Sequence, residues 1–345
     1  MWVKQSKILV TESFAISKAD VVEQYLLKAN KEIPIVISPY HWPDLDGIAC
    51  AYAMEEVMKL WGFSSVRAMI AEEPQREAIW AMNQLGISLP QISLEGYEDI
   101  ILVDTSDPLD IPSFIQPHQV KAILDHRSYH TADSFPNAVA QIEQVGAAAT
   151  LVAEVYLRHI PSPSREAVFL LCAAIASNTA NFKSSGTTAR DIMAANRLQE
   201  LSSFDALEIE KFVADMLLAK SDFSNVPMIK PLGDDLSSSL QTIAGVPTAV
   251  AQLEIVCVQH LLLSRGDEIK ETLHTLKTQR GAESIWLIAI DLNEGKTFFV
   301  FLSDHDKVLV GKVIPFQDNG FVNTILDCIM TRKEVIHKLK EYYRD

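Results

Sequence analysis

Residues 33–53, IPIVISPYHWPDLDGIACAYA, decide how this sequence folds. The apolar run Ile35–Ile37 predicts a short buried strand, and the Ala-rich segment that begins at residue 48 predicts a helix. Asp44 and Asp46 stand two positions apart on the connection between them. Open α/β sheets bind ligands beyond the carboxyl ends of their strands, so this connection is a candidate site. The letters DLDG also fit an ordinary turn, where Asp is favoured for its bonds to the backbone.

Acidic residues recur at the ends of two later apolar runs. The predicted strand 99–104 ends in Asp104, and Asp125 and His126 follow the predicted strand 120–124. Taken singly, Asp104 fits the start of a turn, and His126 fits a structural histidine. The carboxyl ends of parallel strands face one cleft, so we expect these side chains to converge. Clustered carboxylates with an imidazole and no thiolate favour Mn²⁺ or Mg²⁺, which would also relieve their mutual repulsion.

The chain is long enough for two domains at 345 residues. Strands alternate with helices over residues 33–220, which predicts a doubly wound α/β domain with a mostly parallel sheet. Residues 221–245 are rich in Pro, Gly and Ser and predict a linker. Residues 246–345 predict a smaller α+β domain. Residues 1–32 form an N-terminal extension with one predicted helix and no assigned function beyond packing on the sheet edge or a homodimer contact.

Composition restricts the function classes. The net charge of −15 argues against sequence-independent binding to duplex nucleic acid, which needs a basic face, but it allows a small anionic substrate. We find no run of 18 apolar residues and no secretory signal, so we expect no membrane span and a cytoplasmic location. The cysteines lie far apart in apolar segments, which is typical of buried thiols in a reducing compartment. They are Cys50, Cys172, Cys257 and Cys328.

Five motifs occur in order along the chain: DLDG, VDTSD, LDHR, VGAAATLVAEVY and AAIASNTANFKS. Together they resemble the motifs of the DHH phosphoesterase superfamily, and the second domain is similar to the DHHA2 domain. The match covers about residues 33–345 and resembles manganese-dependent (family II) inorganic pyrophosphatases and Prune-type exopolyphosphatases. LDHR favours the Prune-like branch. The resemblance implies an active site in the cleft between two domains, where a metal-bound hydroxide hydrolyses pyrophosphate or short-chain polyphosphate.

The resemblance also implies a role for each matching residue. Asp44 would bind one of two Mn²⁺ ions, with Mg²⁺ and Co²⁺ as alternatives, Asp46 would bind the other, and Asp104 would bridge both. The remaining implied roles are metal binding by His41, His126 and Asn178, orientation of the His126 ring by Asp125, a catalytic clamp on an anionic oxygen by Arg127, and substrate binding by Arg332 and Lys333.

The chain departs from the family pattern at several positions. Tyr40 stands where the family has a metal-binding histidine, and His41 comes one residue late. Arg127 replaces the second histidine, and Asn178 replaces the last metal-binding aspartate. The substrate-binding lysine of a D-x-K pattern near the second domain is missing. These departures keep one alternative open, a catalytically weak or inactive phosphate-binding scaffold. The superfamily resemblance leaves a second, a phosphoesterase that acts on nucleotides, against which the DHHA2-like ending argues.

Overall fold

The structure, a computed structural model, describes residues 21–127, 131–236, 240–318 and 324–344. Two compact units make up the chain. The first unit ends at Ala219, and the second holds residues 220–345 together with the short segment Lys183–Ser185. Most of the predicted N-terminal extension, including the start of its helix, lies outside the described residues.

The first unit is built on a parallel sheet of five strands. The strand order is β2-β1-β3-β4-β5, and every neighbouring pair is parallel. This confirms the predicted α/β class with a parallel sheet. The strands are β1 Ile35–Ser38, β2 Val66–Ala68, β3 Asp99–Val103, β4 Val120–Asp125 and β5 Val139–Ile142.

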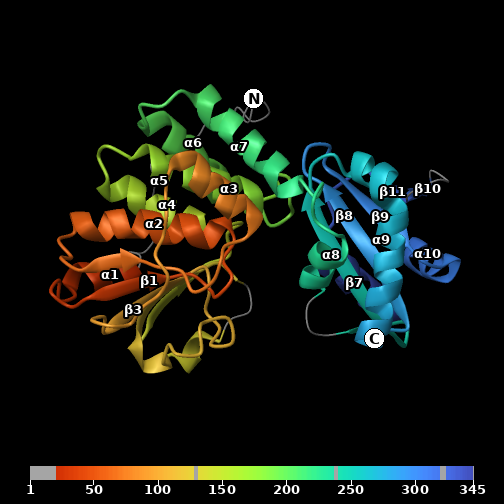
Figure 1. Ribbon diagram of the computed structural model, residues 1–345, viewed down its shortest axis with the longest axis horizontal. Coiled ribbons are helices and arrows are strands. Elements are labelled where there is room, and N and C mark those ends of the chain that lie inside the picture. Colours follow the sequence, from red (N-terminus) through yellow and green to blue (C-terminus); the bar gives the residue numbers. More distant parts are fainter. Residues whose placement is uncertain (1–20, 128–130, 237–239, 319–323, 345) are drawn as a thin grey trace. The chain divides into compact units, whose positions relative to one another are not determined.

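Helices cover one face of this sheet. Helix α2 contacts β1 and β2, α4 contacts β4, and α5 packs against both helices (Figure 1). The other face is closed by an apolar cluster that includes Val36, Leu102 and Phe135. No helix in the described residues is long and apolar enough to cross a bilayer. The helices are α1 Val21–Lys28, α2 Leu45–Leu60, α3 Arg76–Leu85, α4 Ala148–His159, α5 Arg165–Asn178, α6 Ala189–Leu201 and α7 Ala206–Ser221, with short 3₁₀ turns at Pro117–Gln119 and Ala132–Ser134.

The strand order places a crevice at the carboxyl ends of β1 and β3. The chain moves from β1 to β2 on one side and then returns to place β3 on the other side. In doubly wound sheets this reversal leaves the connections after the two strands to diverge, and ligands bind between them. Asp44 and Asp46 follow β1, and Asp104 follows β3, so the topology brings them to this crevice.

The second unit contains a mixed sheet of six strands in the order β10-β11-β9-β8-β7-β6. Strands β7 and β8 are parallel, and the other neighbouring pairs are antiparallel. Its strands are β6 Gln241–Ile243, β7 Val246–Ile255, β8 Ser284–Asp291, β9 Lys296–Phe301, β10 Gln317–Asp318 and β11 Thr324–Leu326. Its helices are α8 Ile229–Asp235, α9 Val258–Arg280, α10 Asp304–Gly311 and α11 Arg332–Tyr343.

The stretch 221–245 differs from the predicted linker, because it contains α8 and β6 and belongs to the second unit. Met228, Leu232 and Leu236 recur every four residues and are buried in the core of that unit. Proline and glycine between them hid this helical spacing in the sequence. The segment forms helix α8 because burial of its apolar side chains stabilises the helix by more than its weak intrinsic helix propensity opposes it.

Gly47, in the first turn of α2, packs closely against Pro39, the residue that follows β1. A Cβ atom at this position would lie 2.7 Å from Pro39 Cβ. We expect Gly47→Ala to lower the free energy of unfolding by about 1–3 kcal/mol, because the helix must shift to relieve the overlap. Urea unfolding measures the change. Gly266→Ala is the matched control, since a Cβ there would meet nothing within 4 Å; equal stability of the two variants would contradict the close approach.

Candidate metal centre

The connection after β1 is shorter than the sequence predicted. Helix α2 begins at Leu45, so Asp46 lies inside its first turn. Asp44 is the N-cap residue, and its Oδ1 atom accepts hydrogen bonds from the N–H groups of Asp46 and Gly47 at 2.9 and 3.2 Å. A capping carboxylate satisfies amides that have no partner within the helix. The Asp44 cap therefore fixes the turn that carries Asp46.

The carboxylate of Asp46 joins the start of α2 to the start of α4. It accepts hydrogen bonds from the N–H groups of Ala148 at 2.8 Å and Ala149 at 2.7 Å. Helix α4 has Ala147 at its N-cap and no capping side chain of its own. Asp46, about a hundred positions earlier, supplies the missing acceptor and a negative charge at the positive end of the helix.

Asp104 and His126 lie beside Asp46. The Nε2 atom of His126 is 3.5 Å from Asp104 Oδ1 and 3.9 Å from Asp46 Oδ2. Ligand atoms of the three side chains all lie within 4.8 Å of one another. Asp104 has a positive φ of 58°, a conformation that L residues adopt rarely and that turns the chain sharply out of β3. The topology thus gathers three side chains from three strand ends.

The ring of His126 is oriented by a backbone carbonyl. Its Nδ1 atom lies 3.0 Å from the carbonyl oxygen of Val145, which favours a proton on Nδ1 and leaves Nε2 free to bind a cation. This differs from the prediction that Asp125 orients the ring. Asp125 instead accepts a hydrogen bond from the backbone N–H of His126 at 2.8 Å and another from the hydroxyl of Ser106. It holds the backbone, not the imidazole.

Asp191 anchors the loop that carries Val145. This buried residue in the first turn of α6 accepts the N–H of Gly146 at 3.0 Å, the N–H of Thr188 at 2.6 Å and the hydroxyl of Thr150. The bonds tie the loop before α4 to α6, so they set where the Val145 carbonyl points. These contacts of Asp191 were not predicted from the sequence. The available signal was the Ala-rich start of α4, which has no Ser, Thr, Asp or Asn at its N-cap and therefore needs capping by residues from elsewhere.

Burial and like charge raise the pKa values of the two central carboxyls. Burial raises the pKa of Asp46 to about 6, with His126 opposing the rise and Asp44 adding to it. Burial also raises the pKa of Asp104 well above its ordinary value, and Asp46 and Asp44 add to that rise. Such shifts arise when carboxylates share a site without a counter-ion. A divalent cation would remove the repulsion, and an Asp, Asp, His donor set suits a hard or borderline cation.

His41 lies outside this group. Its Nδ1 atom lies 2.8 Å from the carbonyl oxygen of Asp110. Tyr40, which stands at the family's histidine position, accepts hydrogen bonds from the N–H of Asp44 at 2.9 Å and from Gln75 Nε2 at 3.2 Å. His41 is not among the three side chains gathered at the crevice, and metal binding by His41 remains a prediction.

Asn178 contacts the group, although not through its oxygen. Its Nδ2 atom donates a hydrogen bond to Asp46 Oδ2 at 2.6 Å. The amide thereby offsets part of the Asp46 charge from the place where the family has an aspartate. In this arrangement Asn178 acts as a donor to a carboxylate, whereas the sequence analysis expected it to offer an oxygen to a metal.

Arg127 lies at the edge of the group and neutralises part of its charge. Its Nη1 atom donates to the carboxylate of Asp110, and its Nη2 atom donates to the carbonyl of Asp104 at 3.2 Å. The guanidinium also lies over the ring of Tyr40, 5.7 Å from its centroid. About a third of the side chain is exposed. A cation held in this position can meet an anionic ligand at the crevice.

Arg332 and Lys333 lie in the second unit, in the first turn of α11. The Nη1 atom of Arg332 donates to the carbonyl of Val250 at 3.0 Å, and its backbone N–H donates to Gln252 Oε1 at 2.5 Å. The side chain of Lys333 is exposed. Both residues therefore belong to a rigidly anchored helix start.

Known proteins resemble the chain along most of its length. A Staphylococcus aureus (strain JH9) protein named "Probable manganese-dependent inorganic pyrophosphatase" is 24% identical over 303 residues, covering 87% of this chain and 95% of the relative. The motif resemblance is confirmed. No protein-family model matches the chain.

Solved structures show the same fold. A Methanococcus jannaschii protein described as a "putative family II inorganic pyrophosphatase" has a TM-score of 0.66 at 21% identity, over 90% of this chain and all of that chain. An exopolyphosphatase-related protein of Bacteroides fragilis has a TM-score of 0.50 at 13% identity, over 96% and 99%. At these identities the likeness supports the fold of both units.

The raised pKa of Asp46 predicts how cation binding depends on pH. A proton and a cation compete for the same oxygen atoms, so lowering the pH favours the proton and weakens binding. With a pKa of about 6, we expect Mn²⁺ affinity to be about tenfold weaker at about pH 5 than at about pH 7. Titration calorimetry across this range measures the change. An affinity that stays constant over the range would contradict the role of Asp46.

Proposed function

We propose that this protein hydrolyses phosphoanhydride bonds in pyrophosphate or short-chain polyphosphate, with Mn²⁺ as its cation. The observation that carries the proposal is the group of Asp46, Asp104 and His126 at the crevice of the parallel sheet. A relative that matches 87% of the chain bears the name of a manganese-dependent inorganic pyrophosphatase, which supports the choice of substrate and cation.

The cation would be held by Asp46, Asp104 and His126 Nε2, with a second cation between Asp44 and Asp104. When bound, the cations would lower the pKa of coordinated water and neutralise charge on the phosphoryl oxygens. Mg²⁺ and Co²⁺ are the alternative ions. The first position has an imidazole and two carboxylates. At the second position Tyr40 stands where the family has a histidine, so we expect this position to bind its cation more weakly.

The protein's own groups would position the substrate. Arg127 would bind a phosphoryl oxygen at the crevice, and Arg332 and Lys333 are the candidate phosphate-binding side chains of the second unit. The Val145 carbonyl would keep His126 in one tautomer, and Asp125 would hold the backbone that carries His126 and Arg127. Positioning and charge stabilisation supply most of the rate in phosphoryl transfer.

Phosphate release from pyrophosphate and tripolyphosphate, with Mn²⁺, Co²⁺ and Mg²⁺ in turn, tests the proposal. We expect turnover with Mn²⁺ and a loss of at least about a thousandfold in kcat in Asp104→Asn, because that side chain faces both cation positions. Asp133→Asn is the matched control, since Asp133 is exposed on a 3₁₀ turn. A folded protein that binds Mn²⁺ but cleaves neither substrate would overturn the proposal and favour a phosphate-binding scaffold.

Asn178→Asp tests whether the amide weakens the cation site. The new carboxylate would face Asp46 Oδ2, where Asn178 Nδ2 now donates at 2.6 Å. We expect Mn²⁺ affinity to rise at least about tenfold, because a carboxylate adds a charged ligand. We expect the metal-free variant to be less stable, because two buried carboxylates would repel each other.

Calorimetry with Mn²⁺ and urea unfolding in chelator measure the two effects. Asn137→Asp is the control, because Asn137 is exposed and precedes β5. It therefore lies at the amino ends of the strands, whereas the cation group lies at their carboxyl ends. Unchanged affinity in Asn178→Asp would remove residue 178 from the cation site.

A further inference from the structure

The second unit contains a pocket of about 470 Å³ at an edge of its sheet. Strand β6 pairs with β7 only over Val246–Thr248, and in the described part of the chain β7 continues past it. Ala249 and Val250 both line the pocket. Neighbouring strand residues point to opposite faces, so the pocket wraps around the edge of β7. A volume of this size is in the range of pockets that enclose organic ligands.

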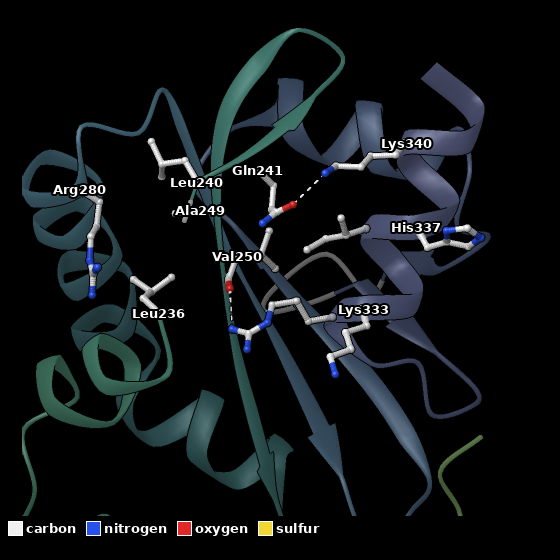
Figure 2. Close-up of a pocket in the computed structure, with 11 residues that line it drawn as sticks. Leu236, Leu240, Gln241, Ala249, Val250, Arg280, Lys333, His337 and Lys340 are labelled. Carbon is white, nitrogen blue, oxygen red and sulfur yellow. Dashed lines mark hydrogen bonds between the residues drawn. The ribbon is translucent and has the colours of Figure 1, made fainter. Parts of the chain in front are cut away.

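Positive charge gathers at this pocket. The described lining includes four Arg or Lys side chains and no Asp or Glu, although the whole chain has a net charge of −15. Helix α11 contributes basic but not acidic side chains to the pocket. Lys333, His337 and Lys340 line it, whereas Glu334 and Glu341 do not. These three positions recur at helical spacing along one side of the helix. Figure 2 shows them on one side of β7, and Arg280 on the other.

Two of the basic side chains, Lys340 and Arg280, make hydrogen bonds to neutral groups. Lys340 Nζ donates to the amide oxygen of Gln241 at 2.9 Å, and Arg280 Nη2 donates to the carbonyl of Gly233 at 3.3 Å (Figure 2 shows the first bond). Both acceptors are neutral, so these bonds orient the cations without cancelling their charge. Oriented cations without a carboxylate partner attract phosphate groups.

The rest of the wall is apolar. Leu236 and Leu240 line it beside Arg280, and Val250 and Ile336 line it beside α11. Inorganic polyphosphate has no apolar part and gains nothing from such a wall. A ligand that combines a phosphate chain with a flat organic group can contact both kinds of surface, in the manner typical of small-molecule sites.

We propose that this pocket binds an organic polyphosphate of the nucleotide type, with the phosphates at Lys340 and the base against the apolar wall. Binding at this site needs no divalent cation, because the pocket's own side chains supply the positive charge. Binding here therefore does not depend on the cations of the metal centre, although Arg332 and Lys333, which line the pocket, are also assigned to the substrate in the proposed function.

Titration of the full-length protein with ATP in the presence of EDTA tests the pocket. We expect one ATP bound per chain and an affinity at least about tenfold greater than that for tripolyphosphate, which lacks the base. Lys340→Gln should weaken ATP binding about tenfold, because one charge-assisted bond to phosphate is lost. Lys338→Gln on the same helix, outside the pocket, should bind ATP as the wild type does.

Leu240→Ser provides a second variant, at an exposed position of the pocket wall. It should weaken binding of ATP and leave the weaker binding of tripolyphosphate unchanged. Equal affinities for ATP and tripolyphosphate, or unchanged ATP binding in Lys340→Gln, would overturn the proposal, as would no ATP binding at all. Since EDTA removes the cations, this result is independent of pyrophosphate hydrolysis, and either proposal can fail while the other stands.

Discussion

The carboxylate of Asp46 is the contact on which the first unit and its site both depend. It accepts the two N–H groups at the start of α4 while it stands in the first turn of α2, so one side chain joins two helix starts. Removing the acceptor would leave buried amides without partners, which is costly in a protein interior. The same carboxylate is one of three candidate cation ligands, so folding and cation binding share one group.

That double role explains the surrounding residues. A carboxylate this deeply buried needs hydrogen-bond donors, and the helix α4 amides and Asn178 provide them in part. The raised pKa of Asp46, about 6, shows that they do not compensate fully. A divalent cation would complete the compensation. Asn178 then appears as a compromise, because its amide stabilises the metal-free site while it offers less to a cation than an aspartate would.

The sequence predicted the parallel sheet and the convergence of Asp46, Asp104 and His126, because strand ends in such a sheet share one edge. It did not predict that Asp46 caps α4 or that Val145 orients His126, since both contacts join residues with no recognisable local pattern. Metal binding by His41 remains a prediction, because its Nδ1 atom lies beside the carbonyl of Asp110 and its ring is outside the group of Asp46, Asp104 and His126. Helix α8 was not predicted because it contains a proline and a glycine, although Leu232 and the flanking Met228 and Leu236 are buried.

Anomalous X-ray diffraction from crystals grown with Mn²⁺ tests most directly whether the strand ends of the parallel sheet form a metal centre. We expect an anomalous peak bounded by the carboxylates of Asp46 and Asp104 and by His126 Nε2, at distances typical of Mn²⁺ ligands. A weaker peak between Asp44 and Asp104 would mark the second cation. Mn²⁺ bound elsewhere on the protein, with no density among these three side chains, would contradict the assignment of the site.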